Sequence, residues 1–264
     1  MKDILEPLRD IEVCCKTDIG PKRARNEDYH VIVMDPGDGR DTRSLGCLFA
    51  IADGMGGHPG GAEASLMACE QLVNYYYENR EIDREDVGAT ARKRLGILER
   101  AILEIHGEIQ KYARVHKQYE GMGTTLSALV LLGSFALTAH VGDSRIYRLR
   151  GLDFEKLTED HTMAQLSVEM GLLKQEEAQD HPMSHVLMQS VGEGLDEVHT
   201  RLEKTMSGDR FLLCSDGLHG VVPDDAIKEI LASSPEVEVA CGRLLAEALG
   251  RGGRDNVTVM VIQV

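Results

Sequence analysis

The stretch from residue 126 to residue 141 limits the fold of this chain more than any other part of the sequence. It is the most apolar window, but Gly133 and Ser134 divide it into two runs of strand length, Leu126–Leu132 and Phe135–Val141. Two apolar runs joined by a two-residue turn are typical of a β-hairpin. The interrupted window is also too short to cross a bilayer as a helix. We therefore expect a buried antiparallel hairpin here.

Shorter apolar runs, several of them rich in β-branched residues, predict further strands. They cover residues 11–15, 29–34, 45–52, 145–149, 210–214 and 257–264. Within 62–76 and 95–112, apolar residues instead recur every three or four positions, which predicts two long helices. The second apolar stripe would also suit a dimeric coiled coil. The first helix offers a partner in the same chain, which favours a helical hairpin.

Two more helices are predicted near the C-terminus. One begins at Pro223, where Asp224 suits the positive N-terminal end of a helix. The other begins with Ser234 as its N-cap and Pro235 as its first residue, and Gly250 ends it.

The order of these elements predicts an α+β fold. Strands follow strands and helices follow helices, whereas parallel βαβ units would alternate them more regularly. No linker rich in proline, serine or charge divides the 264 residues, so we expect one compact domain over 1–264.

Composition argues against several classes of function. The chain has 29 Lys plus Arg and 44 Asp plus Glu, a formal net charge of −15, whereas a nucleic-acid binder requires a basic surface. The six cysteines show no CxxC spacing, which argues against a disulfide framework or a zinc ribbon and favours a reducing compartment. The N-terminal MKDILEPLRD lacks the apolar stretch of a signal peptide. We therefore expect a cytoplasmic protein.

In three places an aspartate lies at the end of an apolar strand, beside a glycine-rich turn. They are Asp53-Gly54, Asp216-Gly217 and Asp255-Asn256. A lone Asp-Gly pair is usually ordinary turn chemistry. The strands before Asp53 and Asp216 are too apolar to face solvent, however, and no second strand follows within hairpin reach. A fourth acidic group, Asn26-Glu27-Asp28, lies just before another strand.

If these carboxylates converge, they predict a site for hard cations. Like charges that come together out of water repel each other and require metal ions or raised pKa values. A ligand set made only of oxygen suits Mg²⁺ or Mn²⁺ rather than zinc. Two such cations would attract a phosphate to this acidic chain and activate a shared water for in-line attack. Arg23, close before Glu27, is the candidate to orient the phosphate, although the basic run PKRAR also suits a solvated arginine.

Other phosphate-handling mechanisms lack their signatures in this sequence. No cysteine is followed by an arginine six positions later, and the motifs Asp-x-Asp, GxxxxGKS/T and GxSxG do not occur. His181 and His185 are four positions apart, but Pro182 interrupts the helix that a zinc site would use. We expect packing to set the role of that pair.

Seven motifs follow one another along nearly the whole chain. In order they are Asp18-x-Gly20-x-x-Arg23-x-x-Asn26-Glu27-Asp28, AIADGMGGH (50–58), GMGTT (121–125), HVGDSRIY (140–147), LTEDHT (157–162), FLLCSDGL (211–218) and GRDNVTV (253–259). Together they resemble the metal-dependent serine/threonine protein phosphatases of the protein phosphatase 2C family, and DGMGGH resembles its bacterial branch.

The resemblance implies a four-layer αββα sandwich, in which two mainly antiparallel sheets pack together and helices flank them. It also implies a centre of two Mn²⁺ or Mg²⁺ ions bridged by Asp53. Asp216 and Asp255 would bind one ion, and Glu27 with the carbonyl of Gly54 would bind the other, partly through water.

Further roles follow from the same resemblance. Asp143, together with Asp216, resembles the residues that hold a third and more labile ion in bacterial members. Arg23 would bind the substrate phosphate. Asp28 and Asn256 would support the metal ligands, although ordinary turn hydrogen bonds would explain these two residues equally well.

Two departures from the family pattern affect the mechanism. Eukaryotic relatives have a histidine just after the Asp-Gly as a proposed proton donor, where this chain has Met55, with His58 three positions later. His58 is thus a candidate catalytic acid, and a glycine-loop histidine outside the chemistry is an equal alternative. The segment 162–191 would form the family's flap beside the active site. There Ser184-His185 replaces the more usual Arg-Asn of HPxRNxL.

The sequence therefore predicts a protein phosphatase that hydrolyses phosphoserine and phosphothreonine by direct attack of a metal-bridging hydroxide. We expect its partners to be phosphorylated proteins, the substrates of a serine/threonine kinase, and we expect a monomer that contacts neither nucleic acid nor membrane. Two alternatives stay open, a catalytically silent relative that binds phosphoproteins and a structural cation site. The complete set of ligands argues against the first, and the phosphate anchor Arg23 argues against the second.

Overall fold

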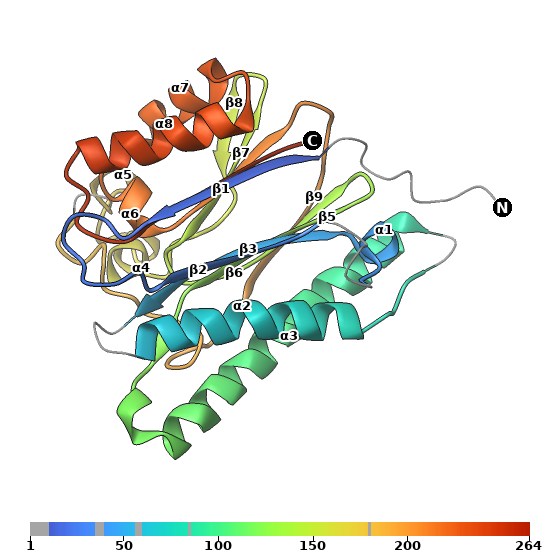
Figure 1. Ribbon diagram of the computed structural model, residues 1–264, viewed down its shortest axis with the longest axis horizontal. Helices are drawn as coiled ribbons and strands as arrows, with labels where there is room; N and C mark the ends of the chain where they lie inside the picture. The colour runs from blue at the N-terminus through green and yellow to red at the C-terminus, as the bar shows by residue number, and fades with distance from the viewer. Residues whose placement is uncertain (1–10, 35–39, 56–59, 84–85, 179–180) are drawn as a thin grey trace.

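The computed structural model describes residues 11–34, 40–55, 60–83, 86–178 and 181–264, and its strands form two sheets (Figure 1). The five-stranded sheet has the order β1 (Glu12–Asp18), β11 (Val257–Gln263), β10 (Arg210–Cys214), β7 (Arg145–Arg150) and β8 (Asp153–Lys156). The six-stranded sheet has the order β2 (Asp28–Val33), β3 (Cys47–Met55), β5 (Leu126–Leu132), β6 (Phe135–Val141) and β9 (His199–Lys204), and the short β4 (Gly123–Thr124) pairs with β3. Every pairing between these strands is antiparallel.

Two pairs of helices cover the outer faces of the sheets (Figure 1). Helices α2 (Gly60–Glu78) and α3 (Val87–Val115) pack on the six-stranded sheet, and α7 (Asp224–Ser233) and α8 (Val237–Gly250) pack on the five-stranded sheet. The predicted four-layer αββα sandwich is confirmed. The apolar stripe of α3 is buried against α2 and the sheet, so the helical hairpin within one chain is also confirmed.

The side chains of β3 point alternately to the two faces of its sheet, which explains why its apolar run is continuous. Phe49 and Ile51 point between the two sheets, where they join a cluster with Phe211 of β10. Leu48 and Ala50 point the other way, into the cluster beneath α2 and α3. Successive side chains of a strand face opposite sides, so a strand that is buried on both faces needs apolar residues at every position.

The predicted strands are all present, with small shifts at their ends. The hairpin of β5 and β6 has the predicted bounds, and Gly133 in its turn has a φ of 54°, the left-handed conformation that glycine adopts most easily.

The start of the last helix differs from the prediction. Helix α8 begins at Val237, whereas Ser234 ends α7, and the Ser234 hydroxyl donates a hydrogen bond to the carbonyl of Ile230. The guanidinium of Arg210, on β10, donates to the carbonyls of Ser234 and Pro235. These contacts hold the connection between the two helices in an extended form, and the local spacing of the sequence does not reveal them.

One end of the sandwich gathers the segments that carry the acidic motifs. Strands β3 and β10 end there, β2 and β11 begin there, and the short helix α6 (Asp216–His219) follows β10. Helices α4 (Met163–Glu169) and α5 (Gln175–Ala178) lie at the same end (Figure 1). The remaining short helices, α1 (Thr42–Leu45) and η2 (Lys117–Tyr119), lie in the connections before β3 and β4. Among the described residues, no helix combines the length and the apolar character needed to cross a membrane.

Candidate active site

The acidic residues that the sequence predicts to converge line one cavity of about 700 Å³ at this end of the sandwich. Its walls include Arg23, Glu27, Asp53, Gly54, Asp143, Asp216 and Asp255. These residues come from the connection before β2, the end of β3, the turn between β6 and β7, the start of α6 and the connection before β11. The fold therefore brings together residues that are far apart in the sequence.

Asp53 lies near the end of β3, where its backbone is held firmly. Its N–H donates to the hydroxyl of Thr125 at 2.9 Å, and its carbonyl accepts from the N–H of Thr125 at 2.9 Å. Asp28 lies directly opposite Asp53 in the pairing of β2 with β3. At Gly54 a Cβ atom would lie 2.2 Å from the carbonyl oxygen of Gly61 in α2, so only glycine fits without a shift of the backbone.

Asp28 joins the two sheets. It belongs to β2 of the six-stranded sheet, but its Oδ2 accepts hydrogen bonds from the hydroxyls of Ser215 at 2.8 Å and Thr258 at 2.6 Å, next to and within strands of the other sheet. Its Oδ1 is buried and has no hydrogen-bond partner among the described residues. Burial, together with the nearby charge of Asp216, raises the pKa of Asp28 to about 7 although the two hydroxyls oppose the shift.

Asp143 and Asp216 are positioned through helix α6. Asp216 is the first residue of this helix, and His219 is its last. The Nε2 of His219 donates to the carbonyl of Asp143 at 3.0 Å, which fixes the turn between β6 and β7 against the helix. A Cβ atom on Gly217 would lie 2.0 Å from the carbonyl oxygen of Asn256, so α6 also packs closely on the start of β11.

Asp255 and Asn256 organise the other wall of the cavity. The Nη2 of Arg23 donates to Oδ2 of Asp255 at 2.5 Å. The side-chain amide of Asn256 donates to two carbonyls of the connection before β2, both at 2.9 Å, and its Oδ1 accepts from the N–H of Glu27 at 2.8 Å. Asn256 thus holds the segment that carries both Arg23 and Glu27.

The carboxylates of the cavity disturb one another's titration. Burial raises the pKa values of Asp53, Asp143 and Asp216 above their ordinary value, and the charges of the neighbouring carboxylates raise them further. The hydrogen bond to Asp255 is the main cause of the raised pKa of Arg23. A group of buried like charges of this kind requires protons or cations to balance it.

The donors on the cavity wall fit hard divalent cations. The acidic groups present only oxygen atoms, and Oδ1 of Asp216 is buried with no hydrogen-bond partner in the described part of the chain. Within the same described ranges, no three acidic, histidine or cysteine side chains already surround one ion position. Mg²⁺ keeps several water ligands and binds through one or two carboxylates, so it suits a roomy cavity with separated oxygen donors.

Two other residues named from the sequence line the cavity. Met55 lines it at the end of β3, and His185 lines it from the segment 162–191. The proposed acid His58 lies outside the described residues.

Four residues that the sequence does not mark as functional belong to this site. Thr125 holds Asp53, His219 holds Asp143, and Arg251 and Arg254 line the cavity. Thr125 and Arg254 lie within quoted motifs, but the motifs alone assign them no contact. The position of His219, one helical turn after Asp216, is a signal only once α6 is known to be a helix.

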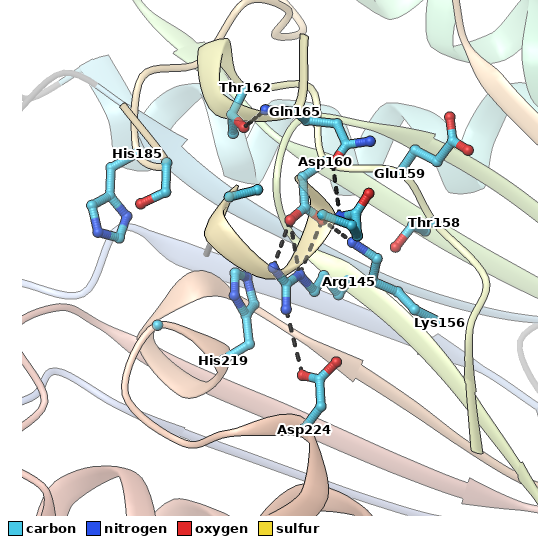
Figure 2. Close-up of a pocket in the computed structure, with 14 residues that line it drawn as sticks. Arg145, Lys156, Thr158, Glu159, Asp160, Thr162, Gln165, His185, His219 and Asp224 are labelled. Atoms are coloured by element: carbon cyan, nitrogen blue, oxygen red, sulfur yellow. Dashed lines mark hydrogen bonds and ion pairs between the residues drawn. The ribbon is translucent and has the colours of Figure 1, made fainter. Parts of the chain in front are cut away.

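A second pocket, of about 370 Å³, adjoins the cavity through His185 and Gly220 (Figure 2). In Figure 2 the guanidinium of Arg145 points toward Asp160 on one side and Asp224 on the other. Arg145 donates to both carboxylate oxygens of Asp160, the shortest contact being 2.6 Å, and lies 3.6 Å from Asp224.

Asp160 is paired with two basic side chains of this pocket. Burial alone would raise the pKa of Asp160, but the positive charges of Arg145 and Lys156 outweigh it, so the pKa lies below its ordinary value. Arg145 follows Asp143 by two positions, and Asp160 precedes the segment 162–191. The ion pair of Arg145 with Asp160 therefore holds the start of the segment 162–191 beside the cavity.

Known proteins resemble this chain in sequence and in fold. The protein phosphatase 2C family model matches residues 24–249. The serine/threonine phosphatase stp of Listeria monocytogenes is 34% identical over 249 residues, which are 94% of each chain.

Solved structures agree with the sequence matches. The structure of the catalytic domain of the phosphatase PstP in complex with two manganese ions has a TM-score of 0.77 at 33% identity, covering 96% of this chain and 97% of that chain. The serine/threonine phosphatase of S. agalactiae has a TM-score of 0.84 at 29% identity, covering 97% and 100%. The chain described here belongs to the protein phosphatase 2C family.

Proposed function

We propose that this chain is a metal-dependent phosphatase that hydrolyses phosphoserine and phosphothreonine in proteins. The observation that carries this proposal is that Arg23 and five carboxylates from separate segments line one cavity. Membership of the protein phosphatase 2C family supports the reaction, and the relatives named serine/threonine phosphatases support the substrate class.

The proposed centre would hold two Mn²⁺ or Mg²⁺ ions. Asp53 would be shared by both ions, Asp216 and Asp255 would hold one of them, and Glu27 and the carbonyl of Gly54 would hold the other. The position of all these residues on one cavity and the manganese ions in the PstP structure support the assignment. When bound, such ions lower the pKa of a water molecule and offset the charge that develops on the phosphoryl oxygens.

A third ion is proposed between Asp143 and Asp216. The hydrogen bond from His219 to the Asp143 carbonyl supports this, because it fixes the backbone of one carboxylate relative to the helix that carries the other. Asp28 and Asn256 would act as supports that hold the ligands in place.

Arg23 is proposed to bind the substrate phosphate. Its side chain is 43% exposed beside the cavity, and its contact with Asp255 aims the guanidinium. A guanidinium has five N–H donors, so donors beyond the one that contacts Asp255 suit a phosphate. His58 stays the proposed proton donor to the leaving hydroxyl, because an imidazole titrates near neutral pH.

The wider setting is proposed on similar grounds. We infer a single-domain monomer over 1–264 in the cytoplasm, in which 162–191 acts as a flap and a serine/threonine kinase supplies the phosphoprotein. All six cysteines are free thiols, which suits a reducing compartment. His185 lines the cavity from the flap, which supports a flap that contacts substrate.

The test is the release of phosphate from matched phosphoserine, phosphothreonine and phosphotyrosine peptides. Chelated protein is titrated with Mn²⁺ and separately with Mg²⁺. We expect turnover that requires metal and favours the first two peptides. A folded, metal-loaded protein that binds these peptides but releases no phosphate would instead be the catalytically silent relative.

A further inference from the structure

An unpaired arginine stands on the wall of the cavity beside the proposed phosphate anchor. Three arginines line the cavity, and two of them have acidic partners: Arg23 contacts Asp255, and Arg251 contacts Glu247 at 2.7 Å. Across the described ranges, no hydrogen bond or ion pair involves the third, Arg254, whose side chain is exposed. Arg254 therefore contributes a positive charge that the fold does not use.

The backbone that carries Arg254 is fixed on both sides. Before it, the N–H of Gly253 donates to the carbonyl of Ala248 at 3.1 Å, a contact that caps the end of α8. After it, the side chain of Asn256 makes the three hydrogen bonds that hold the connection before β2. The guanidinium is thus free, but the site from which it extends is rigid.

Arg254 differs from an ordinary solvated arginine because it lines the cavity of the proposed active site. It directly precedes Asp255, the residue that Arg23 contacts, and both arginines line the same cavity. Arg251 is the remaining arginine of the cavity, and its exposed pair with Glu247 is of a kind that contributes little stability. An anion next to the bound phosphate would contact the side chains of Arg254 and Arg251.

We propose that Arg254, assisted by Arg251, forms a subsite for a second negative charge in the substrate, close to the phosphorylated serine or threonine. This inference rests on the proposed function. The ligand chemistry is an oxyanion that accepts hydrogen bonds from a guanidinium, either a carboxylate or a second phosphate. An extended peptide advances about 3.3–3.6 Å per residue, so the charge would lie within about three residues of the phosphorylated one.

The experiment compares the specificity constants, kcat/KM, of four kinds of phosphothreonine peptide. They carry, at positions one to three residues to either side, a neutral residue, an aspartate, a second phosphothreonine or a lysine. We expect the wild type to favour the aspartate peptide over the neutral one by about two- to fivefold at low salt, and the doubly phosphorylated peptide by more. The preference should shrink at about 1 M salt, where the screening length falls to about 3 Å.

Substitutions of Arg254 test whether this residue causes the preference for acidic peptides. In Arg254→Ala the ratio of kcat/KM for acidic over neutral peptides should fall toward one, and in Arg254→Glu the lysine peptide should become the better substrate. Arg100→Ala is the matched control, because it removes the same charge from an exposed position on α3 and should leave the ratio at its wild-type value. The ratio is internal to each variant, so a general loss of activity does not alter its meaning.

The outcomes separate this inference from the proposed function. If the wild type hydrolyses the neutral peptide but shows no acidic preference, or if Arg254→Ala keeps the full preference, the subsite is wrong while the phosphatase stands. If no peptide is hydrolysed, the proposed function itself fails. A preference for the second phosphate alone, lost in Arg254→Ala, would assign the subsite to phosphate rather than to carboxylates.

Discussion

Three buried aspartates of the cavity destabilise the fold when no metal is bound. Asp53, Asp143 and Asp216 are close enough to raise one another's pKa values, and none of them has a basic partner that lowers its value to the ordinary range. Most buried acids are paired, as Asp209 is with Arg150. Residues that oppose stability at one place are characteristic of a functional site.

Asp53→Asn should therefore have opposite effects on stability and activity. Removal of one like charge should raise the melting temperature of the metal-free protein, by about 2–4 °C for each 1 kcal/mol gained. Metal-dependent turnover should disappear, because the proposed bridging carboxylate is gone. Calorimetry in chelator and phosphate release with Mn²⁺ measure the two effects.

The matched control is Asp209→Asn, which changes a carboxylate whose side chain is wholly buried and paired with Arg150. It should lower the free energy of unfolding by about 1–3 kcal/mol and keep turnover per folded molecule. A stability loss in Asp53→Asn like that in Asp209→Asn would mean that Asp53 supports the fold and not the chemistry.

Arg23 should act on substrate binding and on the transition state without holding the fold. Arg23→Ala should lower kcat/KM for a phosphothreonine peptide by about 10- to 150-fold, which corresponds to a charged hydrogen-bond contribution of about 1.5–3 kcal/mol. Arg23→Lys should recover part of the loss, because it keeps the charge but not the planar fork. Wild-type kinetics in Arg23→Ala would contradict its role as the phosphate anchor.

At the scale of elements, the sequence predicts most of the fold because strands and helices leave different apolar patterns. The unbroken apolar runs of β5 and β6 reflect burial on both faces, and the helical period of α2 and α3 reflects burial on one face. The start of α8 could not be predicted in this way, because Arg210 on a distant strand accounts for the extended residues before it.

The candidate site also contains residues that the sequence reveals and residues that only the folded chain reveals. The acids at strand ends are visible in the sequence because a charge after an apolar run is unusual. Supports such as Thr125 and His219 act through single hydrogen bonds to the backbone, which only the folded chain reveals. The pairing of Asp28 with hydroxyls of the opposite sheet is equally invisible, since those partners lie about two hundred residues away.

One buried charged side chain joins the end of α2 to α3, in addition to the apolar residues that the two helices share. Arg94 is fully buried, donates to the carbonyls of Tyr76 and Asn79 at the end of α2, and places its guanidinium 3.9 Å from the centre of the Tyr76 ring. Arg94→Met should lower the free energy of unfolding by about 2–4 kcal/mol, because two carbonyls lose their donor.

Chemical denaturation measures this loss, and Arg92→Met is the control, since the side chain of Arg92 is 65% exposed and its change should stay within about 0.5 kcal/mol. Equal effects of the two substitutions would show that the buried contacts of Arg94 do not join the helices.

For the whole molecule, two sets of groups link stability to pH in opposite directions. Burial lowers the pKa values of His140, His161 and His219, so these histidines stay neutral in the fold and stability is lost as the pH falls below their ordinary value of 6.5. The raised pKa of Asp28, about 7 against an ordinary 3.8, has the reverse sign, and stability falls as the pH rises through that window.

Divalent cations should relieve only the second effect, because they replace protons on the carboxylates. The rise in melting temperature on addition of Mn²⁺ should therefore be larger at pH 8 than at pH 6, and the histidine contribution cancels in this difference. Thermal melts of chelated and metal-loaded samples measure it. An equal rise at both pH values would mean that the ions bind away from these carboxylates.

The most direct test of the whole account combines metal binding with turnover in the same samples. Chelated wild type, Asp216→Asn and the control Asp224→Asn, whose carboxylate belongs to the adjoining pocket, are titrated with Mn²⁺ by calorimetry and assayed on a phosphothreonine peptide. We predict that wild type and Asp224→Asn bind the ion and release phosphate, while folded Asp216→Asn binds it weakly and releases none. Wild-type binding and turnover in Asp216→Asn would contradict the claim that these strand-end carboxylates form one metal-dependent phosphatase centre.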